Sequence, residues 1–303
     1  MTRSSLLAMS ARRPLLLTFM LLSLALSACG GSDDATVSGS GPSGSGPNAQ
    51  SASGAGLAHI HGLGVSDGAL LIATHTGLWV APEGQTQARR FGKSTQDIMG
   101  FSVLDGDRFI GSGHPDPSQN LPPNLGLIES GDAGKSWKNI SLEGEADFHV
   151  LESSGSRVYG FDGTQGRLMV SSDGGESWDQ RTPPAAMFSL AIDPTSPDRI
   201  VASTEAGLVE STDAGESFRP LAFREQIAGL LAWPAKDRLF LVDGSGQVRR
   251  SDDGGAQFQP VGSIEGQPAA FIAHDDDLYA ALADGSVKRS SDGGESWEVR
   301  ATP

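Results

Sequence analysis

A short turn motif recurs five times along this chain at nearly constant spacing. Each copy begins with a serine, has an aspartate two residues later and a glycine two residues after that, and ends in an aromatic residue. The copies span residues 130–137, 171–178, 211–218, 251–258 and 290–297. Because their first serines lie 39 to 41 residues apart, the chain is an array of equal supersecondary units.

The segment between two copies shows what is repeated. Residues 187–193, 199–203, 207–211 and 216–220 have the length of short strands and are separated by turn residues. Within the motif, the aspartate can accept hydrogen bonds from downstream N–H groups, and the glycine can take the positive φ of a tight turn. Units of four strands and about 40 residues, repeated radially, are blades of a β-propeller. We therefore predict an all-β propeller with four antiparallel strands per blade.

The number of blades follows from one further unit upstream. Residues 62–80 align with the first three strands of the later units, although no aspartate motif follows them. The next unit is longer than the others, with its extra residues in 113–124. Six units fill residues 57–303, so we predict six blades, with the first packing against the last to remove free sheet edges.

The motif S-x-D-x-G-x-[ST]-[WF] resembles that of the BNR or Asp-box repeat proteins, which include sialidases, sortilin-type ectodomains and bacterial lipoproteins labelled sialidase-like or glycosyl hydrolase. The resemblance covers residues 57–303. It implies the propeller fold and carries little information on activity, because the Asp-box turn is structural in the families that have it.

The beginning of the chain has the pattern of a secretory signal. Three arginines precede an apolar run that reaches residue 26, and small residues follow it. The segment Leu-Ser-Ala-Cys at 26–29 resembles a bacterial lipobox, which implies removal of residues 1–28, lipidation of Cys29 and an extracytoplasmic protein anchored to a bacterial membrane. An ordinary signal with an incidental cysteine is the alternative. Cys29 is the single cysteine, so the chain can form no internal disulfide.

Composition bounds the linker and the partners. Residues 29–56 are rich in Gly, Ser, Ala and Pro, which is typical of a flexible linker. The formal net charge of −15 argues against a nucleic-acid partner. We expect a monomer that contacts the membrane through its lipid.

Histidines are concentrated in the first half of the propeller. In a propeller, the loops between second and third strands and those between blades emerge on the face opposite the Asp boxes, and we assign the histidines to that face. Five of the six histidines are candidate metal ligands, with Zn or Cu as the ion that imidazole and carboxylate groups suit. They are His59, His61, His75, His114 and His149. The alternative is a set of polar side chains that line a water-filled channel.

Carboxylates on the same face favour a second interpretation. Glycoside hydrolysis commonly uses two carboxyl groups, and Asp97, Asp147 and Asp162 are the candidates for catalytic residues. The resemblance to sialidases does not extend to their site. The chain lacks an Arg-Ile-Pro motif, and its two tyrosines, Tyr159 and Tyr279, fall within predicted second strands.

The sequence thus favours a membrane-tethered propeller that binds a metal ion or a small polar ligand at a His/Asp cluster opposite the Asp boxes. A glycoside hydrolase acting on a glycan is the alternative. An assembly scaffold for membrane proteins is a weaker one.

Overall fold

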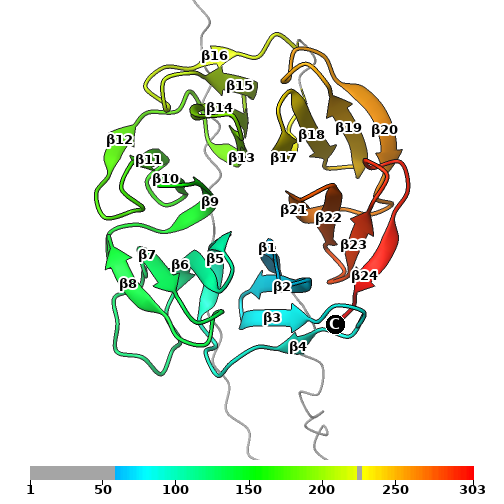
Figure 1. Ribbon diagram of the computed structural model, residues 1–303. Helices are drawn as coiled ribbons and strands as arrows, with labels where there is room; N and C mark the ends of the chain where they lie inside the picture. The colour runs from blue at the N-terminus through cyan, green and yellow to red at the C-terminus, as the bar shows by residue number, and fades with distance from the viewer. Residues whose placement is uncertain (1–58, 224–226) are drawn as a thin grey trace, which may run out of the picture. The chain divides into compact units, whose positions relative to one another are not determined.

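The structure, a computed structural model, describes residues 59–223 and 227–303. In these residues, 24 strands form six four-stranded antiparallel sheets around a central axis (Figure 1). This part of the chain contains no helix, and so none that could cross a membrane. The predicted signal segment at 1–28, Cys29 and the linker at 29–56 lie outside the described residues. The expected all-β propeller of six blades is confirmed.

Each blade consists of four consecutive strands, from the inner strand at the axis to the outer strand at the rim. Blade 1 consists of β1 (Ile60–Ser66), β2 (Ala69–Thr74), β3 (Gly77–Ala81) and β4 (Arg89–Arg90). Blade 2 consists of β5 (Asp97–Asp105), β6 (Arg108–His114), β7 (Leu127–Ser130) and β8 (Lys138–Ser141). Blade 3 consists of β9 (Phe148–Ser154), β10 (Arg157–Asp162), β11 (Arg167–Ser171) and β12 (Asp179–Arg181).

The second half of the ring repeats this order. Blade 4 consists of β13 (Met187–Asp193), β14 (Ser196–Thr204), β15 (Gly207–Ser211) and β16 (Arg219–Pro220). Blade 5 consists of β17 (Gly229–Ala235), β18 (Arg238–Asp243), β19 (Gln247–Ser251) and β20 (Gln259–Ser263). Blade 6 consists of β21 (Pro268–His274), β22 (Asp277–Leu282), β23 (Val287–Ser290) and β24 (Glu298–Ala301).

The Asp box closes the turn between the third and fourth strands by a local hydrogen-bond network. In blade 3, Asp173 Oδ1 accepts a hydrogen bond from the Ser177 N–H at 2.9 Å, as the sequence predicts. The hydroxyl of Ser171 donates to the same carboxylate at 2.7 Å and accepts the Gly175 N–H at 2.8 Å. Gly175 has a φ of +95°, and a Cβ there would lie 2.1 Å from the Leu127 side chain. The serine, which the sequence analysis left without a role, is therefore as central to the turn as the aspartate.

The Asp boxes share a face with the turns between first and second strands. In blade 3 the Gly174 N–H of the box donates to the Ser156 carbonyl at 2.9 Å, and in blade 4 the Ala214 N–H donates to the Asp198 carbonyl at 2.9 Å. Ser156 lies in the first turn of blade 3, and Asp198 lies near the start of β14, just after the first turn of blade 4. The inner strands therefore begin on the opposite face.

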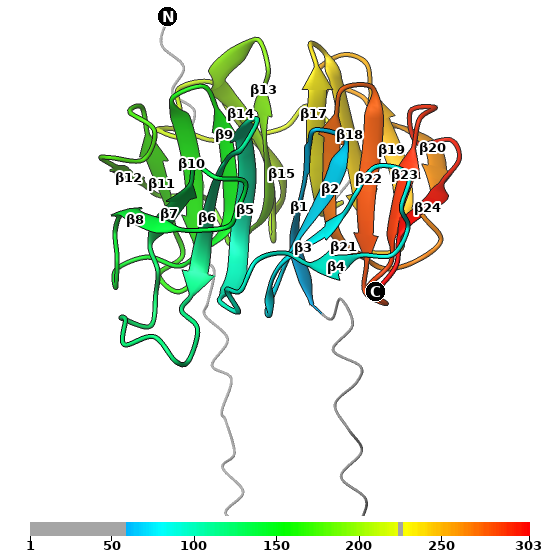
Figure 2. The same cartoon turned by 60° about the horizontal axis from the view of Figure 1, so that its bottom comes forward.

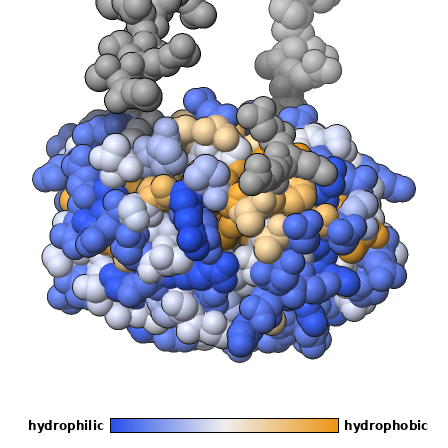
Figure 3. All heavy atoms as spheres, turned by 90° about the horizontal axis from the view of Figure 1, so that it is seen from above, coloured by the Kyte–Doolittle hydropathy of each residue, from blue (hydrophilic) through white to orange (hydrophobic). Residues whose placement is uncertain are grey.

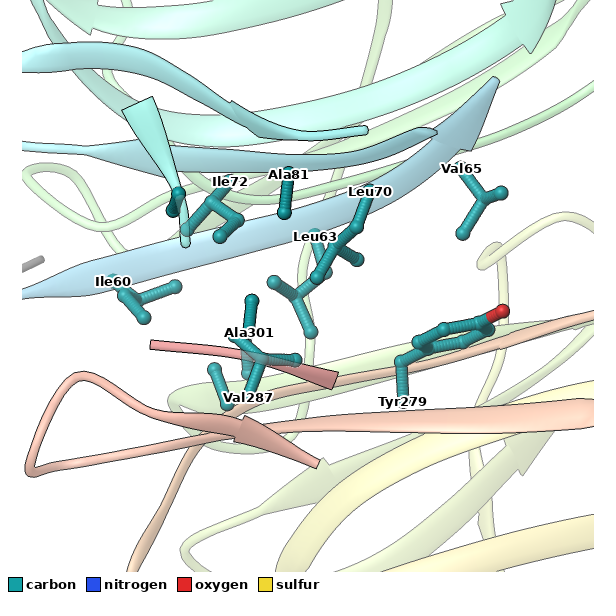
Figure 4. Packing of buried hydrophobic residues seen from close by; sticks show 12 residues of the cluster. Ile60, Leu63, Val65, Leu70, Ile72, Ala81, Tyr279, Val287 and Ala301 are labelled. Atoms are coloured by element: carbon teal, nitrogen blue, oxygen red, sulfur yellow. The ribbon is translucent and has the colours of Figure 1, made fainter. Parts of the chain in front are cut away.

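Hydrophobic clusters lie between neighbouring blades, and the one between blades 1 and 6 closes the ring. Figure 4 shows Leu63 and Leu70 of blade 1 facing Tyr279 and Ala301 of blade 6. The chain end adds a pair of backbone hydrogen bonds, because Thr302 donates to Thr86 at 2.8 Å and accepts from Ala88 at 3.0 Å. Figure 2 shows the C-terminal end beside β4. The predicted packing of the first blade against the last is confirmed.

On the side of the propeller that Figure 3 shows, hydrophilic residues predominate and apolar residues, in orange, are exposed between them. The polar groups that distinguish individual blades lie instead at the central channel.

Candidate functional site

A β-bulge at the start of the inner strand places one side chain of each affected blade at the mouth of the central channel. In blade 1, Ile60 pairs with Thr74 and Gly62 pairs with Ala73, so His61 is the extra residue. The same irregularity recurs in blades 2, 3, 4 and 6. A bulge bends the strand and redirects a side chain, which explains why such irregularities are common beside binding sites.

The side chains at these positions divide the channel mouth into two halves. Blades 1, 2 and 3 contribute His61, Met99 and His149, which all carry metal-ligating atoms. Blades 4 and 6 contribute Phe188 and Ala269, and blade 5, whose strand begins without a bulge, contributes Leu230. All six line one cavity of about 240 Å³. The repeated backbone thus carries a chemically polar half and an apolar half.

His61, His75 and Asp97 form a compact group over blades 1 and 2. The three residues offer ligand atoms that all lie within 4.8 Å of one another. His75 Nδ1 is 2.6 Å from Asp97 Oδ2, and His61 Nε2 is 3.8 Å from Asp97 Oδ1. The His75 ring also lies 4.4 Å from that of His61 and 4.9 Å from that of His59, measured between ring centroids. His59 therefore borders the group and has a φ of +57° at the start of the blade.

Two atoms of this group are buried without a hydrogen-bond partner in the described residues, His61 Nε2 and Asp97 Oδ1. Such orphaned polar atoms are rare in folded proteins and call for a partner. Burial, followed by the neighbouring imidazole of His75, lowers the pKa of His61 to about 4, although Asp97 opposes this shift. His61 is therefore neutral at physiological pH, which is the form that ligates metal ions.

A second group gathers around Asp147, whose side chain is only 2% exposed. Asp147 Oδ2 lies 2.9 Å from His149 Nε2 and 3.5 Å from His114 Nε2. The other oxygen, Oδ1, is buried and has no partner in the described residues. His114 Nδ1 lies within hydrogen-bond distance, 2.9 Å, of the Pro123 carbonyl in the long loop of blade 2, which fixes the ring.

The two groups belong to one electrostatic site. The hydrogen bond to Asp147 raises the pKa of His149, and Asp97 of the first group adds to the shift. The structure thus brings all five predicted histidines to one mouth, but it separates them into a pair around Asp97 with His59 beside it and a pair around Asp147.

Asp162, the third candidate carboxylate, forms its hydrogen bonds with residues of its own turn and the strand that follows. It is fully buried, and its Oδ1 accepts the Thr164 N–H at 3.0 Å and the Thr164 hydroxyl at 2.7 Å. Arg167 Nε donates to Oδ2 at 3.1 Å. Asp243 at the equivalent turn of blade 5 binds Ser245 in the same way. Within the described residues, Asp162 has no hydrogen bond or ion pair to the histidines, although its charge contributes to the raised pKa of His149.

Sequence reasoning did not name two residues that line the channel as site residues, Met99 with its thioether and Glu152 with its carboxyl group. Met99 could be found by aligning the inner strands on their bulges, since it occupies the position of His61 and His149. Glu152 had a plainer signal, because it is a charged residue within the middle of an inner strand.

Comparison with known proteins identifies the fold alone. No protein-family model and no curated protein matches the chain. Among solved structures, YCF48 bound to a D1 peptide is 17% identical with a TM-score of 0.50, over 81% of this chain and 83% of that one. A chain of a nidogen/laminin complex is 14% identical with a TM-score of 0.58, over 73% and 88%. An ancestral GH74 enzyme is 12% identical with a TM-score of 0.53, over 80% of this chain but 38% of the enzyme.

Proposed function

We propose that this propeller is a binding module that takes a divalent transition-metal ion at His61, His75 and Asp97. The observation that carries the proposal is the convergence of three ligand atoms within 4.8 Å, two of whose side chains hold a buried atom without a partner. Bonds of about 2.0–2.2 Å to Zn²⁺ bring neighbouring ligand atoms to within about 4 Å of each other. The 3.8 Å between His61 Nε2 and Asp97 Oδ1 is consistent with that spacing.

Each side chain has a separate task in this proposal. Asp97 Oδ2 lies 2.6 Å from His75 Nδ1 and so orients the His75 ring within the group. Asp97 Oδ1 supplies negative charge, and His61 supplies a neutral imidazole. This donor set suits Zn²⁺ or Cu²⁺. The thioether of Met99 at the same mouth makes Cu⁺ a third ion to be compared, because soft sulfur ligands favour it.

The test is a calorimetric titration of tag-free, chelator-treated protein with Zn²⁺ and, separately, Cu²⁺. We expect one ion per chain in the wild type and a loss of roughly 100-fold in affinity for His75→Ala. His274→Ala is the matched control, because His274 is also an exposed histidine but lies at the far end of β21. Equal affinities of the wild type and His75→Ala, or the absence of binding, would refute the metal site.

Glycoside hydrolysis stays the alternative, and one observation favours it. Asp97 and Asp147 stand at one channel mouth, and each has an oxygen without a partner. The variant Asp147→Asn distinguishes the two functions. A hydrolase would lose turnover of a glycoside in this variant, and the titration would detect no Zn²⁺ binding. A metal site at His61, His75 and Asp97 would still bind Zn²⁺ in this variant.

Two further proposals concern how the propeller is held at a membrane and whether it binds a protein. In the leading one, the module stands outside the cytoplasm, held to a membrane through a lipidated Cys29 and the linker at 29–56. The YCF48 structure contains a bound D1 peptide, and an assembly scaffold for membrane proteins is the weaker alternative here. Capture of a defined membrane-protein partner that is indifferent to His75→Ala and Asp97→Asn would favour the scaffold.

A further inference from the structure

The other end of the central channel holds a larger cavity with different chemistry. It has a volume of about 470 Å³ and opens on the Asp-box face, where the first turns of the blades meet. Its wall combines apolar residues, among them Phe101, Trp233 and Phe271, with serine and acidic residues. A cavity of this size and lining is typical of sites for small organic molecules.

Glu152 of β9 lies between the two cavities. It lines both, together with four apolar residues, and is the single polar side chain common to them. No hydrogen bond or ion pair involves its carboxyl group within the described part of the chain. The open channel leaves it some exposed area. Desolvation by the surrounding blades raises the pKa of Glu152 to about 8.

The fold does not require an acid at this position. Counting from the bulge residue, Glu152 is the third residue after His149, and the equivalent residues of blades 1, 2, 4 and 6 are Gly64, Ser102, Ala191 and Ile272. A lone carboxyl group among apolar walls is unfavourable unless a partner offers charge or hydrogen bonds. Such a group, placed where a small molecule can reach it, points to a ligand rather than to stability.

We propose that the Asp-box end of the channel binds a small organic cation, an ammonium group on an apolar body, whose charge pairs with Glu152. The apolar body would occupy the 470 Å³ cavity, against the apolar residues of its wall. A hard metal ion fits less well, because it requires several oxygen ligands and the wall beside Glu152 supplies few. The proposal does not use the metal site, which lies at the opposite mouth.

The charges that face this cavity set its pH dependence. Besides Glu152, its titratable residues are Asp67, Asp105 and His274 at the rim, and His61 and His149 stand at the other mouth. None of them contributes to the shift of the Glu152 pKa, for which burial is the cause. A cation must therefore displace the proton of Glu152, so its affinity should rise about tenfold per pH unit up to roughly pH 8.

The experiment titrates the full chain with 2-phenylethylammonium and with its neutral isostere, 2-phenylethanol, at pH 6, 7 and 8. We expect the ammonium to bind more tightly than the alcohol, and more tightly at each higher pH. Glu152→Gln keeps the shape of the side chain and should lose at least about tenfold of the affinity at pH 8 together with the pH dependence. Glu176→Gln, on the exposed Asp box of blade 3, is the matched control and should bind as the wild type does.

Three outcomes would overturn the proposal. They are equal binding of the alcohol and the ammonium, unchanged ammonium binding by a folded Glu152→Gln variant, and no saturable binding at millimolar ammonium. Glu152→Leu, with its melting temperature measured beside that of Glu152→Gln, shows that any loss of binding does not come from unfolding. The Zn²⁺ titration reports on the other mouth, so the failure of either proposal is recognised separately.

Discussion

Aspartates stand on both faces of the propeller, but their carboxylates have opposite surroundings. On the Asp-box face, Asp173 accepts hydrogen bonds from the Ser171 and Ser177 hydroxyls and from the Ser177 N–H. These bonds hold the pKa of the carboxyl well below its usual range. On the opposite face, Asp97 and Asp147 contact histidines and each keep one buried oxygen without a partner. A carboxylate whose oxygens all accept hydrogen bonds from its own turn stabilises that turn. A carboxylate with an oxygen that accepts no hydrogen bond can bind a ligand.

The same contrast appears between halves of the ring. Blades 4 to 6 place Phe188, Leu230 and Ala269 at the mouth where blades 1 to 3 place His61, Met99 and His149. Five of the six blades share the bulge at this position, and blade 5 is the exception, so the difference between the halves lies mainly in the side chains. We therefore expect changes on the Asp-box face to alter stability, and changes at the polar half of the mouth to alter binding.

The largest effect on stability is expected from Trp178→Ala, at an Asp box. The Trp178 ring lies 5.1 Å from that of Phe148, and its Nε1 donates to the Ser141 hydroxyl at 2.9 Å. Removing a large packed aromatic should lower the free energy of unfolding by about 3–5 kcal/mol. Urea denaturation measures this loss. Zn²⁺ affinity, titrated below the unfolding transition, should stay at the wild-type value, and a parallel loss of affinity would break the separation of the two faces.

The sharpest comparison is one substitution made on both faces, Asp97→Asn and Asp173→Asn. Asp97→Asn removes the negative charge next to His61 and His75, so Zn²⁺ affinity should fall roughly 100-fold, or about 2.7 kcal/mol. Its unfolding midpoint should change little. Asp173→Asn should do the reverse, with a lower midpoint and normal affinity, because its oxygens bind only the turn. Calorimetric titration measures the Zn²⁺ affinity of both variants, and urea denaturation measures their unfolding midpoints. If both variants changed in the same quantity, the two aspartates would not have different roles.

A smaller loss of stability is expected for Ser171→Ala. The Ser171 side chain is 1% exposed and accepts the buried Gly175 N–H. Alanine leaves that N–H without a partner, which costs about 1–3 kcal/mol. Urea denaturation should show the loss, and Ser177→Ala, at an exposed position of the same box, is the comparison expected to lose less. Equal losses would mean that the aspartate network, and not the buried serine, dominates the turn.

The sequence predicted the parts of the molecule that repeat. The Asp boxes carry their hydrogen bonds within eight residues, so the turn, the four strands of blade 4 and the number of blades could all be inferred from local pattern and period. Which histidines meet could not be inferred, because it depends on contacts between blades. His75 and Asp97 are 22 residues apart and come from different blades. Their pairing reflects the bulges and the packing of neighbouring inner strands, which leave no local signature.

Asp162 and Glu152 show two ways in which prediction from the sequence fails: one residue was named as a site residue although its oxygens are used, and the other was not named. Asp162 was a candidate because its loop faces the site, yet the Thr164 and Arg167 side chains use its oxygens. Glu152 is recognisable in the sequence as a charged residue within an inner strand, but the sequence does not show that its carboxyl group lacks a partner. In both cases the decisive property is the number of free hydrogen-bond acceptors, which becomes visible only with the neighbouring side chains in place.

The last effect we predict concerns the pH dependence of stability, and it tests whether the carboxyl group of Glu152 is unpaired in the folded protein. Its pKa rises from 4.5 to about 8 on folding. The unfolded chain therefore loses this proton first as pH rises, so wild-type stability should fall between about pH 4.5 and pH 8, by at most about 1.4 kcal/mol per pH unit from this group. Glu152→Gln removes that slope. Urea denaturation at pH 5, 6 and 7 should show the variant gaining on the wild type with each step, and two parallel curves would mean that Glu152 is already paired in the folded protein.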